Sequence, residues 1–321
     1  MSVLVFIELA DGEVKKSSLE AVYYGKELAN AMGGKATVLA IGKADNATLA
    51  ALGNYGAAKV LHATEGELET PSIMAYSQVL TAAAQQTGAT VVVAAKSSLG
   101  DAVMARTSGA LKAGIVGNVV SLPDLSNGFT VKRSIFTGKA FANTSISTAV
   151  KMLCLKKSAI TPIESSGTAE VEPFSASLSA NALVAEVKEI SKAADGVPLP
   201  EADLVVSGGR GMQGPDQWQP LLDLAEALGA ATACSKPVSD LDWRPHHEHV
   251  GQTGVKIAPN LYIACGISGA IQHLAGVNAS KTIVVINKDP EAPFFQAADY
   301  GIVGDVFEVL PQLTAAVKAL K

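Results

Sequence analysis

Residues 266–276 read GISGAIQHLAG and bring several polar groups to the start of one predicted helix. Two glycines flank Ser268 in a tight turn, and Gln272 and His273 follow in the first turns of that helix. Glycine lets the backbone approach a bound molecule closely, and a helix N-terminus favours negative charge. A hydroxyl, an amide and an imidazole donate and accept hydrogen bonds. The segment therefore indicates a binding site for a flat or phosphorylated ligand.

Four other segments in the second half of the chain also combine glycine or a small residue with polar side chains. They are SGGRG at 207–211, CSKP at 234–237, VGQTG at 250–254 and INKDPEA at 286–292. All except VGQTG begin at or just after the end of a predicted strand, whereas VGQTG lies in a predicted loop. Parallel α/β sheets bind ligands at the carboxyl ends of their strands. We therefore expect all five segments to line one crevice.

Taken singly, the polar residues of these segments have ordinary structural explanations. A lone His273 is more often a core histidine, Asp305 a helix cap and Arg210 a surface cation. A glycine at a strand–helix turn is as often purely structural. Their convergence favours binding, with donors and acceptors for a heterocycle, a sugar or a base on Gln252, Thr253, Gln272, His273, Asn287 and Asp305.

The run GRGMQG at 209–214 satisfies G-x-G-x-x-G after a predicted strand, which by itself suggests a nicotinamide dinucleotide site. The acidic residue expected about 20 residues further on is missing. The nearest carboxylate there is Asp240, beyond a proline, and the next helix starts at Pro215, after the glycines. We expect a phosphate-binding glycine loop of another type, in which backbone amides and Arg210 contact an anion.

The stretch RPHHEHV at 244–250 raises the alternative of a metal site, with His246, His247 and His249 close together. No carboxylate or cysteine is placed to complete a recognisable ligand set, and the stretch lies in a predicted loop. We therefore expect no metal here.

Catalytic groups are scarce in the sequence. There is no nucleophile elbow, no catalytic triad order, no Walker lysine and no glycosidase-like pair of carboxylates. Many binding groups with few catalytic ones are typical of a protein whose cofactor carries the chemistry while the protein tunes it.

The first 190 residues show the element order of an α/β domain. Strands are predicted at 3–9, 36–42 and 90–96, and helices at 18–32 and 71–86, an alternation that indicates a mainly parallel sheet. The helix at 18–32 places its apolar residues on one face, namely Leu19, Val22, Tyr23, Leu28 and Met32. Later in this domain strands predominate, at 114–122, 129–147, 151–157 and 183–190.

Residues 191–202, SKAADGVPLPEA, are rich in Pro, Gly and small polar residues and are predicted to be a linker. A second α/β domain follows at 203–321, built on a parallel sheet. Its strands are predicted at 203–209, 261–266 and 281–288, and its helices at 215–229, after Ser268, and at 305–320. Asp305 is the expected N-cap of the last helix.

Composition supports a chain of two α/β domains. The 321 residues are 48% hydrophobic and 17% charged, enough to build large cores, and the net charge of −5 argues against a nucleic-acid partner. No apolar run is long enough to span a membrane, and no basic segment precedes the first apolar stretch, so neither a membrane protein nor a secreted one is expected. Three separated cysteines, Cys154, Cys234 and Cys265, are expected to be buried reduced thiols in a cytoplasmic protein.

The segments VGQTGVKIAPNLYIACGISGAIQHLAG at 250–276 and INKDPEAPFFQAADYGIVGD at 286–305 resemble the alpha subunit of the electron transfer flavoproteins. The resemblance covers nearly all of 203–321. It is looser in the N-terminal domain, where KRSIFTGKAFA at 132–142 carries it.

This resemblance implies one FAD and a heterodimer with a beta subunit, with the N-terminal domain forming a lobe with or beside that subunit. The C-terminal nucleotide-binding domain would hold FAD at the interface. Thr253 would lie near flavin N5, His273 near the pyrimidine carbonyl O2, Ser268 near the pyrophosphate or ribityl chain, and Asn287 and Asp305 on the ADP half. The implied FAD contacts are Arg210, Ser235, Lys236, Val250, Gly251, Gln252, Thr253, Ser268, Gly269, Ala270, Ile271, Gln272, His273, Asn287, Asp305 and Val306.

One residue departs from the family. The family reads Ser-Arg-Pro or Ser-Arg-Ala where this chain reads Ser235-Lys236-Pro237, and the family's arginine lies over the flavin. Lysine keeps the positive charge but loses the planar guanidinium. The resemblance implies that the Lys236 side chain approaches the flavin and favours its anionic reduced forms.

The resemblance implies electron transport by a flavoprotein rather than catalysis on a substrate. Flavoprotein dehydrogenases would donate the electrons, and an acceptor such as a membrane-associated quinone reductase would take them. Two alternatives remain: a flavoenzyme with its own small-molecule substrate, and an adenine-nucleotide-binding regulator without flavin. The expected location is the cytoplasm of a bacterium, or the mitochondrial matrix in a eukaryote.

Overall fold

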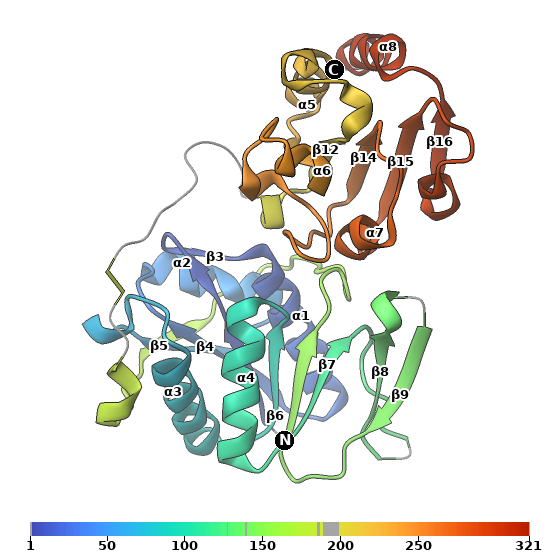
Figure 1. The fold of residues 1–321 in the computed structure, drawn as a ribbon. Helices are drawn as coiled ribbons and strands as arrows, with labels where there is room; N and C mark the ends of the chain where they lie inside the picture. The colour runs from blue at the N-terminus through green and yellow to red at the C-terminus, as the bar shows by residue number, and fades with distance from the viewer. Residues whose placement is uncertain (1, 127, 139, 185–186, 189–198, 321) are drawn as a thin grey trace. The chain divides into compact units, whose positions relative to one another are not determined.

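The computed structural model describes residues 2–126, 128–138, 140–184, 187–188 and 199–320 (Figure 1). The chain divides into two compact units, Met1–Ile190 and Ser191–Lys321. Each unit has its own sheet and its own core.

The N-terminal unit is built on one large, mainly parallel sheet. Among the described residues its strand order is β11-β5-β4-β1-β6-β10-β7-β8-β9, with antiparallel pairing only for β7–β8 and β8–β9. The strands are β1 Ser2–Ile7, β4 Lys35–Ile41, β5 Lys59–Ala63, β6 Ala89–Ala95, β7 Gly114–Val119, β8 Thr130–Ile135, β9 Ala140–Ser145, β10 Lys151–Leu155 and β11 Glu170–Pro173. A separate antiparallel pair is formed by β2 Leu9–Ala10 and β3 Glu13–Val14.

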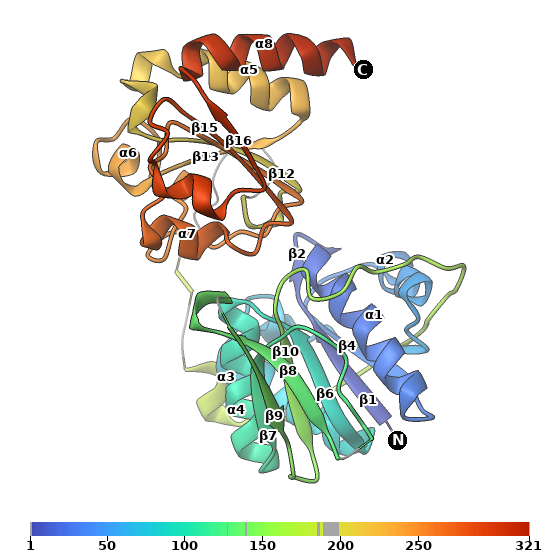
Figure 2. The ribbon, with the colours of Figure 1, turned by 90° about the vertical axis from the view of Figure 1, so that its right-hand side faces the viewer.

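Helices cover both faces of this sheet (Figure 2). Helices α1 (Lys16–Ala31) and α2 (Asn46–Ala50) lie on one face, and α3 (Ile73–Gln86) and α4 (Ser98–Leu111) on the other. In β1, Val3 and Val5 pack toward α1 while Leu4 and Phe6 pack toward α3. Because both faces are covered, this strand is apolar at successive positions rather than alternating.

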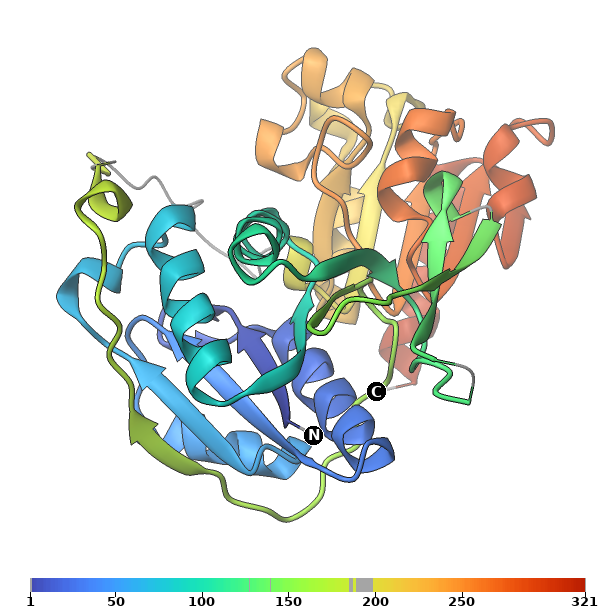
Figure 3. The same ribbon diagram turned by 90° about the horizontal axis from the view of Figure 1, so that it is seen from below.

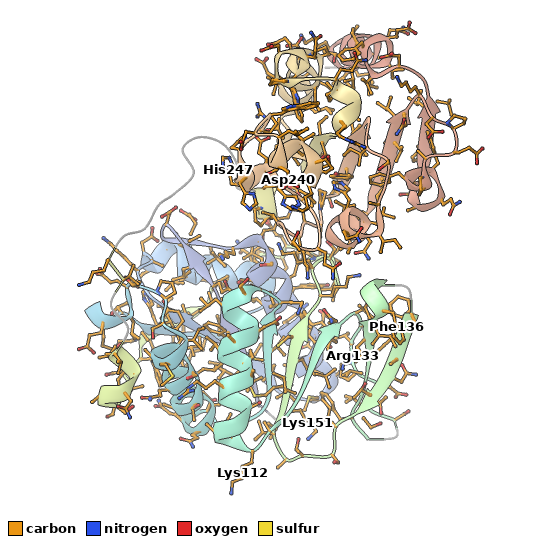
Figure 4. The ribbon with its side chains drawn as sticks, in the orientation of Figure 1. Lys112, Arg133, Phe136, Lys151, Asp240 and His247 are labelled. Atoms are coloured by element: carbon orange, nitrogen blue, oxygen red, sulfur yellow. The ribbon has the colours of Figure 1, made fainter. Side chains whose placement is uncertain are left out.

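The antiparallel end of the sheet reaches beyond these helices (Figures 1 and 3). β8 pairs with β7 through Val119 and Arg133 only, and with β9 along its whole length. Phe136 and Phe141 are 76% and 56% exposed, and Phe136 stands at the end of the hairpin in Figure 4. The β8–β9 hairpin therefore presents aromatic surface to its surroundings.

Most elements predicted for this unit are present, and two details of the prediction are wrong. Tyr24, not Tyr23, is fully buried on α1, because the helix packs on β1 through Gly25, where an added Cβ would lie 2.4 Å from Val5. The described residues of the predicted strand at 183–190 form no strand, and a short 3-10 turn ends at Leu183. The sequence did not lead us to predict four elements of this unit, namely helices α2 and α4 and strands β5 and β11.

The C-terminal unit contains a fully parallel sheet in the order β13-β12-β14-β15-β16. Its strands are β12 Leu204–Gly208, β13 Ala231–Cys234, β14 Leu261–Cys265, β15 Thr282–Asn287 and β16 Tyr300–Val303. From β12 the chain goes outward to β13 and then crosses back to β14 on the other side of β12. The strand order therefore reverses between β12 and β14, which is where parallel sheets bind ligands. The prediction of two α/β domains, the second on a parallel sheet, is confirmed.

Helices again lie on both faces of this sheet (Figure 2). Helices α5 (Gln219–Leu228) and α8 (Val306–Ala319) cover one face, and α7 (Ile271–Val277) covers the other, while α6 (Lys236–Asp240) follows β13. The predicted cap of α8 is confirmed, because the Asp305 carboxylate accepts a hydrogen bond from the Phe307 backbone N–H at 2.9 Å. Helix α5 begins at Gln219 rather than Pro215, since Pro215–Gln217 form a 3-10 turn.

The predicted linker at 191–202 falls largely outside the described residues, which resume at 199. Leu199 and Ala202 are buried in the core of the C-terminal unit. Of the helices in the described part of the chain, none is long and apolar enough to cross a membrane.

Candidate functional site

The loops that follow four neighbouring strands of the C-terminal sheet leave the same edge. Backbone hydrogen bonds join them directly: Ser235 N–H donates to the Gly208 carbonyl at 3.0 Å, Gly211 N–H to Gly266 at 3.0 Å, and Gly266 N–H to Ile286 at 2.9 Å. The structure thus brings together SGGRG, CSKP, GISGAIQH and INKDPEA, as their positions at strand ends predict.

The VGQTG segment, predicted to be a loop, is anchored to the same edge. The Val250 N–H donates to the Cys234 carbonyl at the end of β13, at 3.0 Å. The Gln252 N–H donates to the Gln272 carbonyl in α7, at 2.7 Å. All five segments therefore meet at one place in the fold.

The glycines of these loops mainly allow the loops to pack against one another. A Cβ added to Gly211 would lie 2.6 Å from the Cα of Gly266, and one added to Gly276 would lie 2.6 Å from the Cα of Gly251. Both distances are too short for a side chain. Glycine is therefore required at these positions by the packing of the loops on one another, because backbone of the same chain occupies the space of a side chain.

The backbone of the 209–214 loop is also largely used within the protein. Arg210–Met212 form a 3-10 turn, and the N–H groups of Gly209, Gly211, Met212, Gln213 and Gly214 all donate to backbone carbonyls. The predicted phosphate-binding glycine loop is wrong in this respect, because these amides have no hydrogen left for an anion. The exposed side chain of Arg210 and its own backbone N–H, which donates to no carbonyl in the described chain, remain for one.

Helix α7 starts slightly later than the sequence indicates. Its N-cap is Ala270, so Ser268 lies in the preceding turn, where its carbonyl accepts from the Phe294 N–H at 3.1 Å. Gln272 lies in the first turn with its side chain exposed. The neighbouring Ile271 is 70% exposed, which places an apolar side chain among polar ones at this edge.

Several polar side chains at this edge are exposed and unused. These side chains make no hydrogen bond or ion pair in the part of the chain that the structure describes. They belong to Arg210, Gln252, Thr253, Ser268 and Gln272. These groups have their full donor and acceptor capacity left for a ligand.

His273 is the exception, because its side chain points into the protein and is only 6% exposed. Its Nε2 is hydrogen-bonded to the Tyr262 hydroxyl at 2.7 Å, and its Nδ1 is buried without a hydrogen-bond partner among the described residues. Burial lowers the pKa of His273 to about 4, so the ring is neutral at pH 7. Tyr262 had no prediction, since it sits inside a strand and no local pattern links it to His273.

Ser235 and Lys236 lie at the end of β13. Ser235 is buried at the N-cap position of α6, and Lys236 is 58% exposed. The Lys236 ammonium forms an ion pair with both carboxylate oxygens of Asp240, one turn further on, at 2.8 and 2.9 Å. The positive charge of Lys236 therefore acts together with a neighbouring negative one, a partner that the sequence analysis did not identify.

The last three candidate residues have structural roles of their own. The Asn287 side chain donates to the Ile267 carbonyl at 3.0 Å and accepts from the Asp289 N–H at 3.1 Å. The Asp305 carboxylate caps α8, and Val306 is buried in the core that α8 shares with α5. Of Val306, only the backbone is left for a ligand.

The three histidines of the 244–250 stretch differ in their surroundings. His246 is hydrogen-bonded to the Ser239 hydroxyl, His247 is exposed (Figure 4), and His249 is buried beneath Gly254, whose added Cβ would lie 2.9 Å from the His249 ring. No group of three potential metal ligands occurs among the described residues. The three cysteines are free and buried, and burial raises the pKa of each thiol to about 12.

Known families match both halves of the chain. Residues 3–179 match the electron transfer flavoprotein domain, and residues 198–278 match the electron transfer flavoprotein FAD-binding domain. The chain is 37% identical over 321 residues to the electron transfer flavoprotein subunit alpha of Bacillus subtilis, covering 99% of this chain and 98% of that protein.

Two further relatives come from Pseudomonas aeruginosa and Caenorhabditis elegans. The electron transfer flavoprotein subunit alpha of Pseudomonas aeruginosa is 47% identical over 189 residues, which cover 59% of this chain and 61% of that protein. The probable mitochondrial electron transfer flavoprotein subunit alpha of Caenorhabditis elegans is 36% identical over 270 residues, covering 81% of this chain and 78% of that protein.

Proposed function

This chain belongs to the electron transfer flavoprotein family as an alpha subunit, and on that premise we propose that FAD lies along the carboxyl edge of its C-terminal sheet, in a heterodimer with a beta subunit. The single observation that carries the proposal is the row of exposed, unused polar side chains at the point where the strand order reverses. FAD supplies the redox chemistry, and the chain supplies binding and electrostatics.

The residues present fit such a cofactor. Arg210 provides a cation for a phosphate, while Gln252, Thr253 and Gln272 provide amide and hydroxyl groups for the polar edge of a flavin. Ile271 offers apolar surface beside them.

For the remaining FAD contacts we propose the same residues that the resemblance implies. Ser235, Lys236, Val250, Gly251, Gly269 and Ala270 belong to the same loops. Three of the implied contacts lie beyond residues 198–278, the part that matches the FAD-binding domain, namely Asn287, Asp305 and Val306. Their side chains already have other contacts within the protein. We therefore expect these three to contribute mainly by holding the edge of the sheet in shape, with Asn287 and Asp305 beside the ADP half.

The proposed role is electron carriage between a flavoprotein dehydrogenase and an acceptor such as a membrane-associated quinone reductase. The exposed Phe136 and Phe141 on the β8–β9 hairpin support a protein partner for the N-terminal unit, because a second subunit would remove this aromatic surface from water.

A flavoenzyme with its own substrate would need an acid or base with a free proton-accepting atom at the site. His273 offers no such atom to a substrate, because one nitrogen is hydrogen-bonded to Tyr262 and the other is buried.

The chain purified alone is expected to hold much less FAD than the chain purified with a beta subunit. The proposed ligands all lie along one exposed edge, so nothing in the described C-terminal unit covers the opposite face of a flat ring. The ratio of flavin absorbance to protein in the two preparations measures this. Full flavin occupancy of the isolated chain would contradict the prediction.

Two variants give this experiment a control. Gln272→Leu removes an unused amide at the proposed site, whereas Gln312→Leu removes an exposed amide from the middle of α8. Loss of FAD from the heterodimer only with Gln272→Leu supports the site. Equal FAD content in both variants would show that Gln272 does not contact the cofactor.

Opposite shifts of the flavin reduction potential are expected from the two members of the Lys236–Asp240 ion pair. Lys236→Met removes a positive charge and lowers the potential, while Asp240→Asn removes the neighbouring negative charge and raises it. An unpaired charge about 4 Å away would shift the potential by roughly 100–200 mV. The exposed, paired ammonium is expected to shift it by only tens of mV. Lys236→Arg is expected to raise the potential slightly, since guanidinium stays charged and can stack on the ring.

Spectroelectrochemical titration of the heterodimer measures these potentials. Glu308→Gln, on α8, is the control for losing a carboxylate elsewhere in the C-terminal unit. If Lys236→Met and Asp240→Asn both agree with the unsubstituted protein within about 20 mV, less than 1 kcal/mol, the pair does not act on the flavin.

A further inference from the structure

The stretch RPHHEHV at 244–250 contains an ion pair between its first and fifth residues. Nε and a terminal nitrogen of Arg244 donate to the two carboxylate oxygens of Glu248, at 2.8 and 2.6 Å. Glu248 is only 7% exposed, and the side chain of Arg244 is half-buried. A bidentate pair of this kind fixes the orientation of both side chains as well as their distance. The turn from 244 to 248 is therefore held in one geometry.

Two further contacts tie this pair to the elements around it. The Thr232 hydroxyl, in β13, donates to the Glu248 carboxylate at 3.0 Å. The Arg244 guanidinium lies 5.3 Å from the centre of the buried Trp218 ring, just before α5 begins. A guanidinium over an indole face is attracted by the ring electrons. The pair thus fastens the turn to the edge strand of the sheet and to the start of α5.

Glu248 lies directly before the VGQTG segment in the chain. His249 pairs with Cys234 in parallel register, and the Val250 N–H donates to the Cys234 carbonyl at 3.0 Å. Residues 249–250 therefore run along the end of β13. Since consecutive Cα atoms are 3.8 Å apart, a displacement of Glu248 is passed on to Val250 within two residues.

The anchored turn joins two groups of proposed FAD contacts. Ser235 and Lys236 come before it, and 250–253 come after it. A weaker contact also holds the turn, between His246 Nδ1 and the Ser239 hydroxyl at 3.1 Å. Charge-assisted bidentate hydrogen bonds are about twice as strong as neutral ones. The carboxylate of Glu248 is therefore the main side-chain anchor between these two groups.

We propose that Glu248 is a positioning residue of the cofactor site: its carboxylate, held by Arg244 and Thr232, sets where the backbone of 250–253 lies along the edge of the sheet. The identity of the cofactor, FAD, rests on the proposed function, whereas the position of this segment depends only on this chain. Contact groups displaced by about 1 Å hold a ligand less well, so the anchor contributes to cofactor affinity without touching the cofactor.

Two variants separate positioning from stability. Glu248→Leu leaves the half-buried Arg244 without its partner, whereas Arg244→Met together with Glu248→Leu replaces the whole pair by apolar side chains. Breaking a buried ion pair is strongly destabilising, but replacing both partners is often neutral. We expect Glu248→Leu to lower the urea midpoint measured by tryptophan fluorescence, and the double variant to recover most of it. FAD binding by the heterodimer is expected to be about fivefold weaker in both variants, because neither restores the anchor.

Asp299→Asn is the control for losing a carboxylate elsewhere in the same sheet. The Asp299 carboxylate accepts from the Ile283 N–H at 2.8 Å, near the amino end of β15 and away from the carboxyl edge. We expect this variant to leave FAD affinity unchanged. A double variant that regains FAD affinity together with its urea midpoint would overturn the positioning role, as would equally weak FAD binding in Asp299→Asn.

The position of the segment can also be tested in the chain purified alone. The Val250 and Gln252 N–H groups donate to the carbonyls of Cys234 and Gln272, so their hydrogen exchange reports how firmly the segment is held. We expect faster exchange of both amides in the double variant than in the unsubstituted chain. Unchanged exchange would overturn the proposal. If the unsubstituted heterodimer binds no FAD, the proposed function fails, while the exchange rates still decide whether Glu248 positions the segment.

Discussion

Gly276→Ala is expected to destabilise the C-terminal unit by about 2–3 kcal/mol, the usual cost of overpacking, although alanine normally favours a helix. Gly276 lies in α7, and an added Cβ would be 2.6 Å from both the backbone N and the Cα of Gly251. Since backbone cannot rotate away as a side chain can, α7 and the VGQTG segment must separate. We expect weaker FAD binding as a second consequence.

Gly109→Ala is the matched control, because Gly109 also lies in a helix, α4, but an added Cβ would meet nothing within 4 Å. There alanine is expected to stabilise the N-terminal unit by about 0.5–1 kcal/mol. The two tryptophans of the chain, Trp218 and Trp243, both belong to the C-terminal unit. Tryptophan fluorescence during urea unfolding thus follows that unit, and circular dichroism follows both. An unchanged fluorescence midpoint for Gly276→Ala would show that the loops separate at little cost.

The free energy of unfolding of the C-terminal unit is expected to fall by about 2 kcal/mol between pH 7 and pH 5 because of His273. Burial, and after it the charge of His249, lower the pKa of His273 from 6.5 to about 4. The unfolded chain therefore binds a proton near pH 6.5, while the folded chain does so only near pH 4. Stability from this group is present above pH 6.5 and is lost as the pH falls through this window.

Urea unfolding, monitored by tryptophan fluorescence at several pH values, tests this prediction. The unsubstituted protein is compared with the His273→Gln and His247→Gln variants. The pKa of His249 is also lowered, chiefly by burial, but its contribution is the same in both variants. We expect a smaller loss of stability on acidification for His273→Gln. The exposed His247→Gln variant is expected to follow the unsubstituted protein. Parallel pH profiles for all three proteins would show that His273 is not buried in its neutral form.

Much of the fold was predictable because its signals are local. Apolar runs such as 90–96 indicate strands covered on both faces, and the 3.6-residue period indicates the helix at 18–32. The Asp305 cap depends on a contact two residues away. Of the strand predicted at 183–190, residues 185, 186, 189 and 190 lie outside the described residues. Leu183 instead ends a 3-10 turn, because an apolar stretch alone does not supply a partner strand.

The candidate site was predictable only in outline. Loops after parallel strands must share one edge, so the meeting of the four segments at strand ends followed from the element order. The anchoring of VGQTG at the same edge required the structure. The order of the strands, which puts the reversal between β12 and β14, required the structure. The structure was also needed to tell which side chains at that edge are exposed and which are in the core. Gln252 is exposed, whereas Val306 is in the core.

The sequence by itself determined the family, the two α/β domains and the loops that converge, since these depend on residue types and on neighbours within a few positions. The tertiary structure decided what the glycines and His273 do. Gly211 and Gly276 pack against the backbone of other segments, and His273 is hydrogen-bonded to Tyr262 on a neighbouring strand. Such contacts join residues that no short-range pattern links, and their distances are fixed only when the sheet and helices pack together.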